Sequence, residues 1–319
     1  MNKENLQQVW SKLEPSEEGV FQYKLISEHS VPILCLGFKG IKKALILEVP
    51  ANADISRYKD NERENISFIN LKTAKCLCIV LEDSYFEDLF DDLVLSIFTH
   101  TVDISSIETY LSSFHRTFMK WSSLFAGKHN EGLTPYQLQG LIGELLYLEH
   151  QIDGTTDINE ELNSWRGPYD EGHDFIKESL DIEVKTITQT SNNVKISSEF
   201  QLESAPGKSL VLAVIRLMPN TENGISLSVI IDRLKDQIIL KDGDLSIFVK
   251  ALLQKGIDSY TAQNYKNQRF IPQNLEKYTC DSERFPKIIR SNSHDAINSI
   301  KYSINLTLLT DFKLSQIDF

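Results

Sequence analysis

The sequence predicts a mixed α/β (α+β) fold, in which a central mixed β-sheet flanked by helices lies between a β-rich region and an α+β region. Three observations support this prediction. Short runs rich in β-branched and aromatic residues fill the first 85 positions, which is typical of strands. Apolar residues then recur every three or four positions, which indicates amphipathic helices. Further strand-like runs follow between residues 174 and 217.

An N-terminal β-rich domain is expected over residues 1–104. Gly, Pro, Asn and Asp punctuate this region and favour turns between strands. A helix is expected over residues 85–99, and a second, over residues 105–125, bridges into the next domain. The expected strands cover residues 21–26, 31–38, 43–49, 66–71 and 74–81.

The central domain is expected over residues 105–225, and an α+β region over residues 226–319. After a polar break at residues 127–132, Thr134 as N-cap and Pro135 in the first turn predict a helix that runs to about residue 150. The C-terminal region begins with amphipathic helices and ends with an extended run at residues 299–309. Strands of the central domain are expected at residues 174–177, 180–188, 194–197 and 210–217.

Composition limits the class of protein. A 41% hydrophobic and 24% charged chain is an ordinary globular protein, and its apolar runs are far shorter than a membrane span. Because the N-terminus has no apolar leader segment, we expect a cytoplasmic protein with no membrane partner. No two of the cysteines form a CxxC pair, so buried reduced thiols are favoured over a zinc site.

The net charge of -12 argues against non-specific coating of nucleic acid, because Lys and Arg supply most of that affinity. A nucleic-acid partner would need local basic clusters. For each candidate cluster, a solvated surface is the more ordinary interpretation. The candidates are Lys39 with Lys42 and Lys43, Lys266 with Arg269, and Arg284 with Lys287 and Arg290.

The expected strand at residues 180–188 carries the first chemical signal. A period of two places Asp181, Glu183 and Lys185 on one face and apolar side chains on the other. A carboxylate and an amine therefore share one face of a rigid element. A bare Glu-X-Lys is more often a salt-bridged strand face than a nuclease site.

An acidic residue upstream strengthens this signal. A hairpin with Glu178 and Ser179 as its loop places Asp174 opposite Glu183, with Cβ atoms roughly 4.5–5.5 Å apart. Two carboxylates at that distance repel unless a cation lies between them. A divalent metal ion meets this requirement.

The expected helix from residue 135 supplies a third acid. Glu144 lies just beyond the edge of its apolar stripe, so it can face a site at the edge of the sheet. Gly140 and Gly143 each weaken a helix by up to about 1 kcal/mol relative to alanine, which indicates close approach of another backbone. The stripe consists of Leu138, Leu141, Ile142, Leu145 and Leu148.

Residues 134–218 resemble the PD-(D/E)XK nuclease superfamily. More narrowly, they are similar to an uncharacterised family named only for that motif, which is often encoded near bacterial restriction and phage-defence genes. The literal Pro-Asp dipeptide is absent, since His173 precedes Asp174. The resemblance rests on the helix with Gly143-Glu144-Leu145, on Trp165-Arg166-Gly167-Pro168 leading to His173-Asp174-Phe175, and on Asp181-Ile182-Glu183-Val184-Lys185-Thr186.

The resemblance implies a restriction-endonuclease-like core with helices on both faces of the sheet, built in the order helix, three strands, helix, strand. It implies that Asp174 and Glu183 bind Mg²⁺, for which Mn²⁺ substitutes, and that Glu144 adds a further ligand. Lys185 would orient or activate the attacking water. His173 is expected to be a structural partner of the site rather than a ligand.

The function implied is endonucleolytic hydrolysis of DNA in a restriction or phage-defence system, with a methyltransferase or ATPase subunit as a further partner. A homodimer is reasonable, because double-strand cuts often use two active sites. The alternative is an inactive nuclease-like subunit that binds DNA or assembles a defence complex, which fits the acidic charge. A small-molecule phosphohydrolase is disfavoured, because no Gly-rich phosphate loop is present.

Several polar residues beside the motif can be interpreted either as part of the site or as structural residues. Asp170 and Glu171 are alternative acids for the site. Ser197, Ser198 and Gln201 follow the third strand, where they either contact substrate or cap a helix. Capping is the safer expectation for these three residues.

Overall fold

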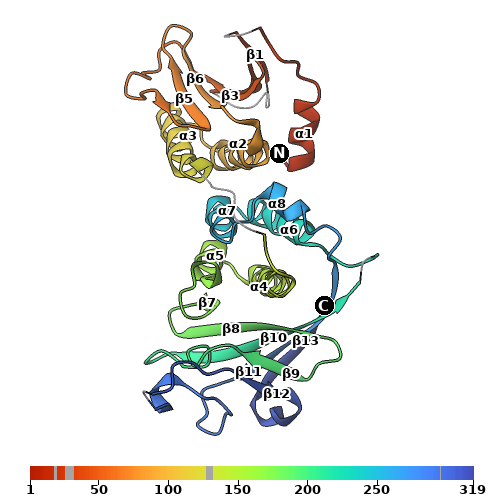
Figure 1. The fold of residues 1–319 in the computed structure, drawn as a ribbon. Coiled ribbons are helices and arrows are strands. Elements are labelled where there is room, and N and C mark those ends of the chain that lie inside the picture. Colours follow the sequence, from red (N-terminus) through yellow and green to blue (C-terminus); the bar gives the residue numbers. More distant parts are fainter. Residues whose placement is uncertain (18–19, 26–31, 127–131, 221, 295) are drawn as a thin grey trace. The chain divides into compact units, whose positions relative to one another are not determined.

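The computed structural model describes residues 1–17, 20–25, 32–126, 132–220, 222–294 and 296–319 (Figure 1). The chain forms two compact units, Met1–His129 with Ile238–Ser246 and Asn130–Gln237 with Ile247–Phe319. The three domain ranges predicted above stay predictions. Most of the expected polar break at residues 127–132, and the strand ends expected at residues 26 and 31, lie outside the described residues.

The first unit is built on a six-stranded antiparallel sheet with the strand order β1-β2-β3-β6-β5-β4. Five of its strands occur where the sequence predicted them, whereas the two-residue β4 was not predicted. The strands are β1 (Phe21–Leu25), β2 (Ile33–Lys39), β3 (Lys42–Glu48), β4 (Asn61–Glu62), β5 (Ile66–Leu71) and β6 (Cys76–Leu81).

Helices pack against this sheet. Phe68 of β5 contacts the rings of Phe114 and Phe118, with ring centroids 6.3 and 5.1 Å apart. The expected helices over residues 85–99 and 105–125 are confirmed, each with a short 3-10 turn beside it. The elements are α1 (Lys3–Trp10), η1 (Ser84–Phe86), α2 (Glu87–Thr101), α3 (Ile107–Ser122) and η2 (Leu124–Ala126).

The cysteines and the first basic cluster have structural roles. All four cysteines are buried and free, as predicted. Lys42 pairs with Glu82 at 2.5 Å, and Lys43 pairs with Glu87 at 3.0 Å. Each of these two lysines therefore already has an acidic partner.

The second unit contains a mixed five-stranded sheet with the order β13-β11-β10-β8-β7. Only β8 and β10 run parallel among its described pairs. This sheet and its helices confirm the predicted fold class. Strands β11 and β13 were not predicted. The sheet comprises β7 (Phe175–Ile176), β8 (Leu180–Thr188), β10 (Ser209–Pro219), β11 (Phe270–Thr279) and β13 (Lys313–Asp318).

Helices and short turns complete this unit. None of the described helices is long and apolar enough to cross a membrane. The helices are α4 (Pro135–Gly154), α5 (Ile158–Ser164), α6 (Leu227–Leu240), α7 (Leu245–Gln254) and α8 (Ser259–Gln263), and the 3-10 turns are η3 (Gly167–Tyr169), η4 (Arg290–Asn292), η5 (Leu306–Leu308) and η6 (Thr310–Phe312).

The second face of the sheet corrects one expectation. Helices α4 and α5 lie on one side of β8, whereas β9 (Asn193–Ile196) and β12 (Tyr302–Asn305) form a two-stranded sheet on the other (Figure 1). Val194 and Ile196 of β9 join a buried cluster with Leu212 of β10. The expectation that helices cover both faces of the sheet was therefore wrong. The expectation that the third strand belongs to the central sheet was also wrong. The alternating burial of β9 gives it one apolar side, which suits a covering layer rather than the centre of a parallel sheet.

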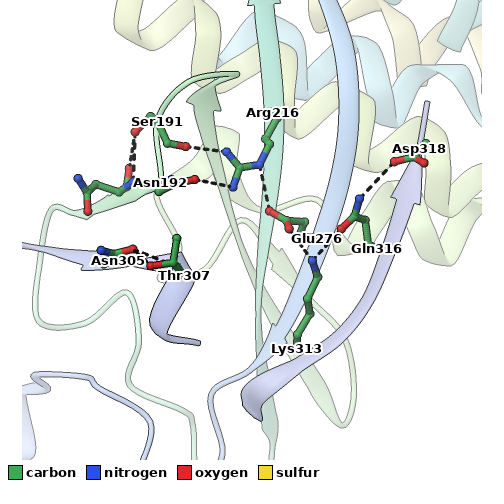
Figure 2. Close-up of polar contacts among 10 residues, drawn as sticks. Ser191, Asn192, Arg216, Glu276, Asn305, Thr307, Lys313, Gln316 and Asp318 are labelled. Atoms are coloured by element: carbon green, nitrogen blue, oxygen red, sulfur yellow. Dashed lines mark hydrogen bonds and ion pairs between the residues drawn. The ribbon is translucent and has the colours of Figure 1, made fainter. Parts of the chain in front are cut away.

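Charged side chains connect β10, β11 and β13 at the β13 edge of this sheet (Figure 2). Glu276 of β11 is buried and accepts from Arg216 of β10 at 3.1 Å and from Lys313 at 2.6 Å. Arg216 also donates to the backbone oxygen of Ser191 at 2.6 Å. Removing the acid would leave two half-buried cations unpaired, so this network helps to hold β13 on the edge of the sheet.

Helix α4 positions the first candidate residue. Thr134 caps the helix and Pro135 occupies its first turn, as the sequence predicted, and Gln137 completes a capping box with Thr134. The helix continues to Gly154 rather than ending near residue 150, because no glycine or proline lies between residues 144 and 153. Glu149 therefore lies within the helix, where it pairs with Arg233 at 2.7 Å.

Candidate active site

The β7–β8 hairpin brings two acids together. Phe175 pairs with Ile182, and the Lys177 N–H donates to the Leu180 oxygen at 2.9 Å across the loop. The predicted register is therefore confirmed, and the next pair in it is Asp174 and Glu183. In addition, Asp174 Oδ2 accepts the backbone N–H of Val184 at 2.8 Å, which fixes this carboxylate against β8.

A second segment holds Asp174 from the other side. Its backbone oxygen accepts the N–H groups of Arg166 at 2.7 Å and Gly167 at 2.9 Å. Trp165 forms an isolated β-bridge with Phe175. The motif segment around residue 166 therefore acts as a short backbone support for the acid, a role that depends on its position in the fold.

Glu144 of α4 reaches the same place. Its Oε2 accepts a hydrogen bond from Trp165 Nε1 at 2.8 Å, and the indole itself is only 1% exposed. Glu144 Oε2 and Asp174 Oδ1 lie 2.5 and 3.1 Å from the position that a Cβ atom on Gly167 would occupy. The glycine thus leaves a small space bounded by two carboxylates.

Glu183 and Lys185 form the third part of the site. Lys185 Nζ lies 2.5 Å from Glu183 Oε1, and the Glu183 side chain is 2% exposed. This contact shows that the two side chains share a face of β8, as their spacing predicted. Glu183 is therefore directed toward the lysine.

One pocket of about 240 Å³ unites these residues. Ser197 and Gln201 also line it, and the Ser197 N–H donates to Gln201 Oε1 at 2.7 Å within a turn. Because a turn rather than a helix follows β9, the helix-capping expectation is wrong. The lining of the pocket includes Glu144, Asp174, Glu183 and Lys185, with Tyr136, Gln137 and Lys255.

Burial dominates the electrostatics of the site. It raises the pKa of Glu144 and of Glu183 to about 8, and the neighbouring Asp174 adds to both shifts. Burial also raises the pKa of Asp174, which Lys185 partly offsets. Burial alone would lower the pKa of Lys185, but Glu183 and Asp174 outweigh it and raise that pKa. The three carboxyl groups therefore resist being ionised at the same time unless a further cation lies nearby.

Mg²⁺ prefers hard oxygen donors such as carboxylates. Within the described ranges, no group of three His, Cys, Asp or Glu side chains has the geometry to hold a metal ion. Two hard oxygen donors, from Glu144 and Asp174, do converge beside Gly167. Mg²⁺ is usually bound by one or two carboxylates together with waters and substrate phosphates. The residues present therefore fit a Mg²⁺ ion held by these two acids.

The comparison with protein families decides the relationship. The model of the family DUF4420, whose description places it with PD-(D/E)XK family members, matches residues 6–307. The chain belongs to the DUF4420 family. The match extends well beyond the segment 134–218 that carries the motif resemblance, so both units share the family relationship. The chain has no match among the curated proteins or the solved structures compared with it.

Other polar residues of this DUF4420 chain lie around the site. The Asp170 side chain is 94% exposed, Glu171 pairs with Arg166 at 2.6 Å, and neither alternative acid lines the pocket. His173 is buried, with Nδ1 at 3.6 Å from Asp181 Oδ2. This position agrees with the expected structural role of the histidine.

The raised pKa values predict a pH effect on stability. In the metal-free DUF4420 chain, the folded state binds more protons than the unfolded state between the ordinary pKa of Glu144, 4.5, and its folded value of about 8. The contribution of this group to the free energy of unfolding therefore falls as pH rises through this window. Glu144→Gln cannot ionise, so its stability relative to the wild type should increase from about pH 5 to about pH 8.

Urea unfolding in EDTA at several pH values would measure this difference. Glu160→Gln is a matched control, because that side chain is exposed on α5. A Glu144→Gln difference that stays constant with pH would contradict the expected shift.

Proposed function

We propose that this chain is a metal-dependent endonuclease that hydrolyses phosphodiester bonds of DNA in a bacterial restriction or phage-defence system. The observation that carries the proposal is the convergence of Glu144, Asp174, Glu183 and Lys185 on one pocket, from α4 and the β7–β8 hairpin. Membership of a PD-(D/E)XK family supports the same chemistry.

Each of these side chains has a proposed task. Glu144 and Asp174 would hold Mg²⁺, and Glu183 would complete the acidic group by moving away from Lys185. Bound Mg²⁺ supplies positive charge to the phosphate and lowers the pKa of a water molecule. The ammonium of Lys185 would orient the attacking water with its remaining N–H donors. Trp165 would keep Glu144 aimed at the site through its 2.8 Å hydrogen bond.

Purified full-length chain incubated with supercoiled plasmid tests the proposal. We expect nicked or linear DNA with Mg²⁺ or Mn²⁺, and intact plasmid with EDTA, because the acids alone cannot neutralise a phosphate. A labelled RNA of matched sequence shows whether the chain cuts DNA in preference to RNA. Absence of cleavage with either metal, together with absence of Mn²⁺ binding by calorimetry, would reject the nuclease proposal.

The alternative is a subunit that keeps the nuclease-like fold without its activity. The net charge of -12 and the pairing of Glu183 with Lys185 favour it. It predicts DNA binding or complex formation without cutting. A methyltransferase or ATPase partner, a homodimer and a cytoplasmic location remain expectations from the resemblance and composition, to be tested by co-purification, light scattering and cell fractionation.

A further inference from the structure

A second lysine lines the pocket from a segment that carries no motif. Lys255 follows α7 and borders the same pocket as Glu144, Asp174 and Lys185. Its positive charge lowers the pKa of both Glu144 and Asp174, although burial outweighs this effect. The ammonium therefore acts on the two carboxylates that bound the space beside Gly167.

The backbone of Lys255 is fixed at the end of α7. The Ile257 N–H donates to the Leu252 oxygen and the Gly256 N–H to the Leu253 oxygen, both at 2.9 Å. These two bonds form a Schellman motif, and Gly256 has the left-handed φ of +74° that such a motif requires. The Lys255 side chain thus starts from a rigid point, and it is only 27% exposed.

The partner of Lys255 can be displaced easily. Its nearest ion-pair contact is Asp170 Oδ1 at 3.7 Å, and that side chain is 94% exposed. Such a surface pair contributes about 0–1 kcal/mol. Lys185, in contrast, lies 2.5 Å from the buried Glu183. A phosphate entering the pocket can therefore replace Asp170 at Lys255 at little cost, whereas Lys185 is held by a buried acid.

Two residues of the third basic cluster singled out in the sequence already donate to backbone oxygens. Lys287 Nζ donates to the backbone oxygen of Cys280 at 2.6 Å, and Arg290 donates to that of Ile297 at 2.7 Å. These side chains satisfy the chain's own carbonyl groups. Lys255, by comparison, combines a position in the pocket with a weak, solvent-exposed partner.

We propose that Lys255 is a further catalytic residue, whose ammonium binds a non-bridging oxygen of the phosphate that is cut. This inference rests on the proposed nuclease function. A pocket with three acids repels a phosphodiester anion, and negative charge on the non-bridging oxygens increases as water adds to phosphorus. A fixed cation aimed at those oxygens stabilises the transition state more than the ground state.

The test compares Lys255→Met, which keeps the aliphatic stem, with Lys255→Arg, which keeps the charge. Lys250→Met is a matched control, because Lys250 is an exposed lysine of the same helix. For Mg²⁺-dependent duplex cleavage, we expect Lys255→Met to lower kcat about 10²- to 10³-fold. Lys255→Arg should recover part of this loss, and Lys250→Met should cut like the wild type. Melting temperatures should stay close to the wild-type value.

A second readout does not need cleavage. In duplex binding with Ca²⁺ in place of Mg²⁺, Lys255→Met should reduce the slope of log Kd against log salt by about 1, the value for one lost phosphate contact. Lys250→Met should leave the slope unchanged.

Three results would overturn the inference. They are wild-type kcat and salt slope in Lys255→Met, an equal loss in Lys250→Met, and a loss accompanied by a lower melting temperature without recovery in Lys255→Arg. A wild-type chain that does not cut is a different failure. It rejects the proposed function, while the salt slope still decides whether Lys255 contacts phosphate.

Discussion

Asp174→Asn is expected to lower DNA cleavage by about 10³-fold or more, while the chain keeps its fold. Asparagine retains an oxygen that can accept the Val184 N–H, the bond that now measures 2.8 Å, so the hairpin loses little. The negative charge beside Glu144 is lost, and with it a ligand of the proposed Mg²⁺. Because burial raises the pKa of Asp174, removing this acid should not destabilise the metal-free protein.

The same cleavage assay separates the other members of the site. Glu183→Ala and Lys185→Ala are expected to lose cleavage as well, since each removes one half of the 2.5 Å pair. Glu160→Gln is the control, because that side chain is exposed on α5 and has no part in the pocket. Circular dichroism and thermal melting would verify the fold of every variant. If all three site variants cut plasmid at the wild-type rate, the assignment of this pocket as the active site is wrong.

Gly143→Ala is expected to destabilise the second unit and to reduce cleavage with it. A Cβ atom at this position would overlap Thr186 Cγ2 of β8, so α4 and the strand would have to separate. Overpacking of this kind costs about 1–3 kcal/mol, against a gain of up to about 1 kcal/mol in helix propensity. Since α4 carries Glu144 and β8 carries Glu183, separation would also open the site.

Gly140 provides the matched control for that variant. A Cβ atom there would meet nothing within 4 Å, so Gly140→Ala should be neutral or stabilising by up to about 1 kcal/mol. Urea unfolding of both variants would measure the difference. Thr186→Ser, which removes the overlapping methyl group, should restore Gly143→Ala. Equal stability of the two alanine variants would contradict a close contact between α4 and β8.

Local sequence patterns were sufficient to predict the hairpin that carries Asp174 and Glu183. A two-residue loop fixes the register of its strands, so Asp174 and Glu183 could be paired from spacing alone. The helical stripe likewise predicted that Glu144 faces the sheet edge. Of the two helical glycines, the close approach expected at Gly143 is observed, although Thr186 makes it through its side chain, and the one expected at Gly140 is not.

The remaining parts depend on contacts between distant segments. Nothing near Lys255 in the sequence signals that the turn after α7 reaches the pocket. Trp165 matched the motif, but its hydrogen bond to Glu144 requires α4 to lie beside it. Strand β11 was missed because Pro272 and several polar residues interrupt its apolar pattern, and β13 because its residues are largely exposed. Their pairing with the sheet, not their own composition, makes them strands.

Gly167 offers a way to test the proposed nuclease function across this family. Glu144 Oε2 and Asp174 Oδ1 lie 2.5 and 3.1 Å from the place where any other residue would carry its first side-chain carbon. A relative with alanine or a larger residue there would retain the scaffold, the tryptophan and even both carboxylates, yet its first side-chain carbon would displace the Glu144 carboxylate or shift the backbone. If the proposed function holds, natural variation at this single backbone position should separate branches of the family that cut nucleic acid from branches that only bind it.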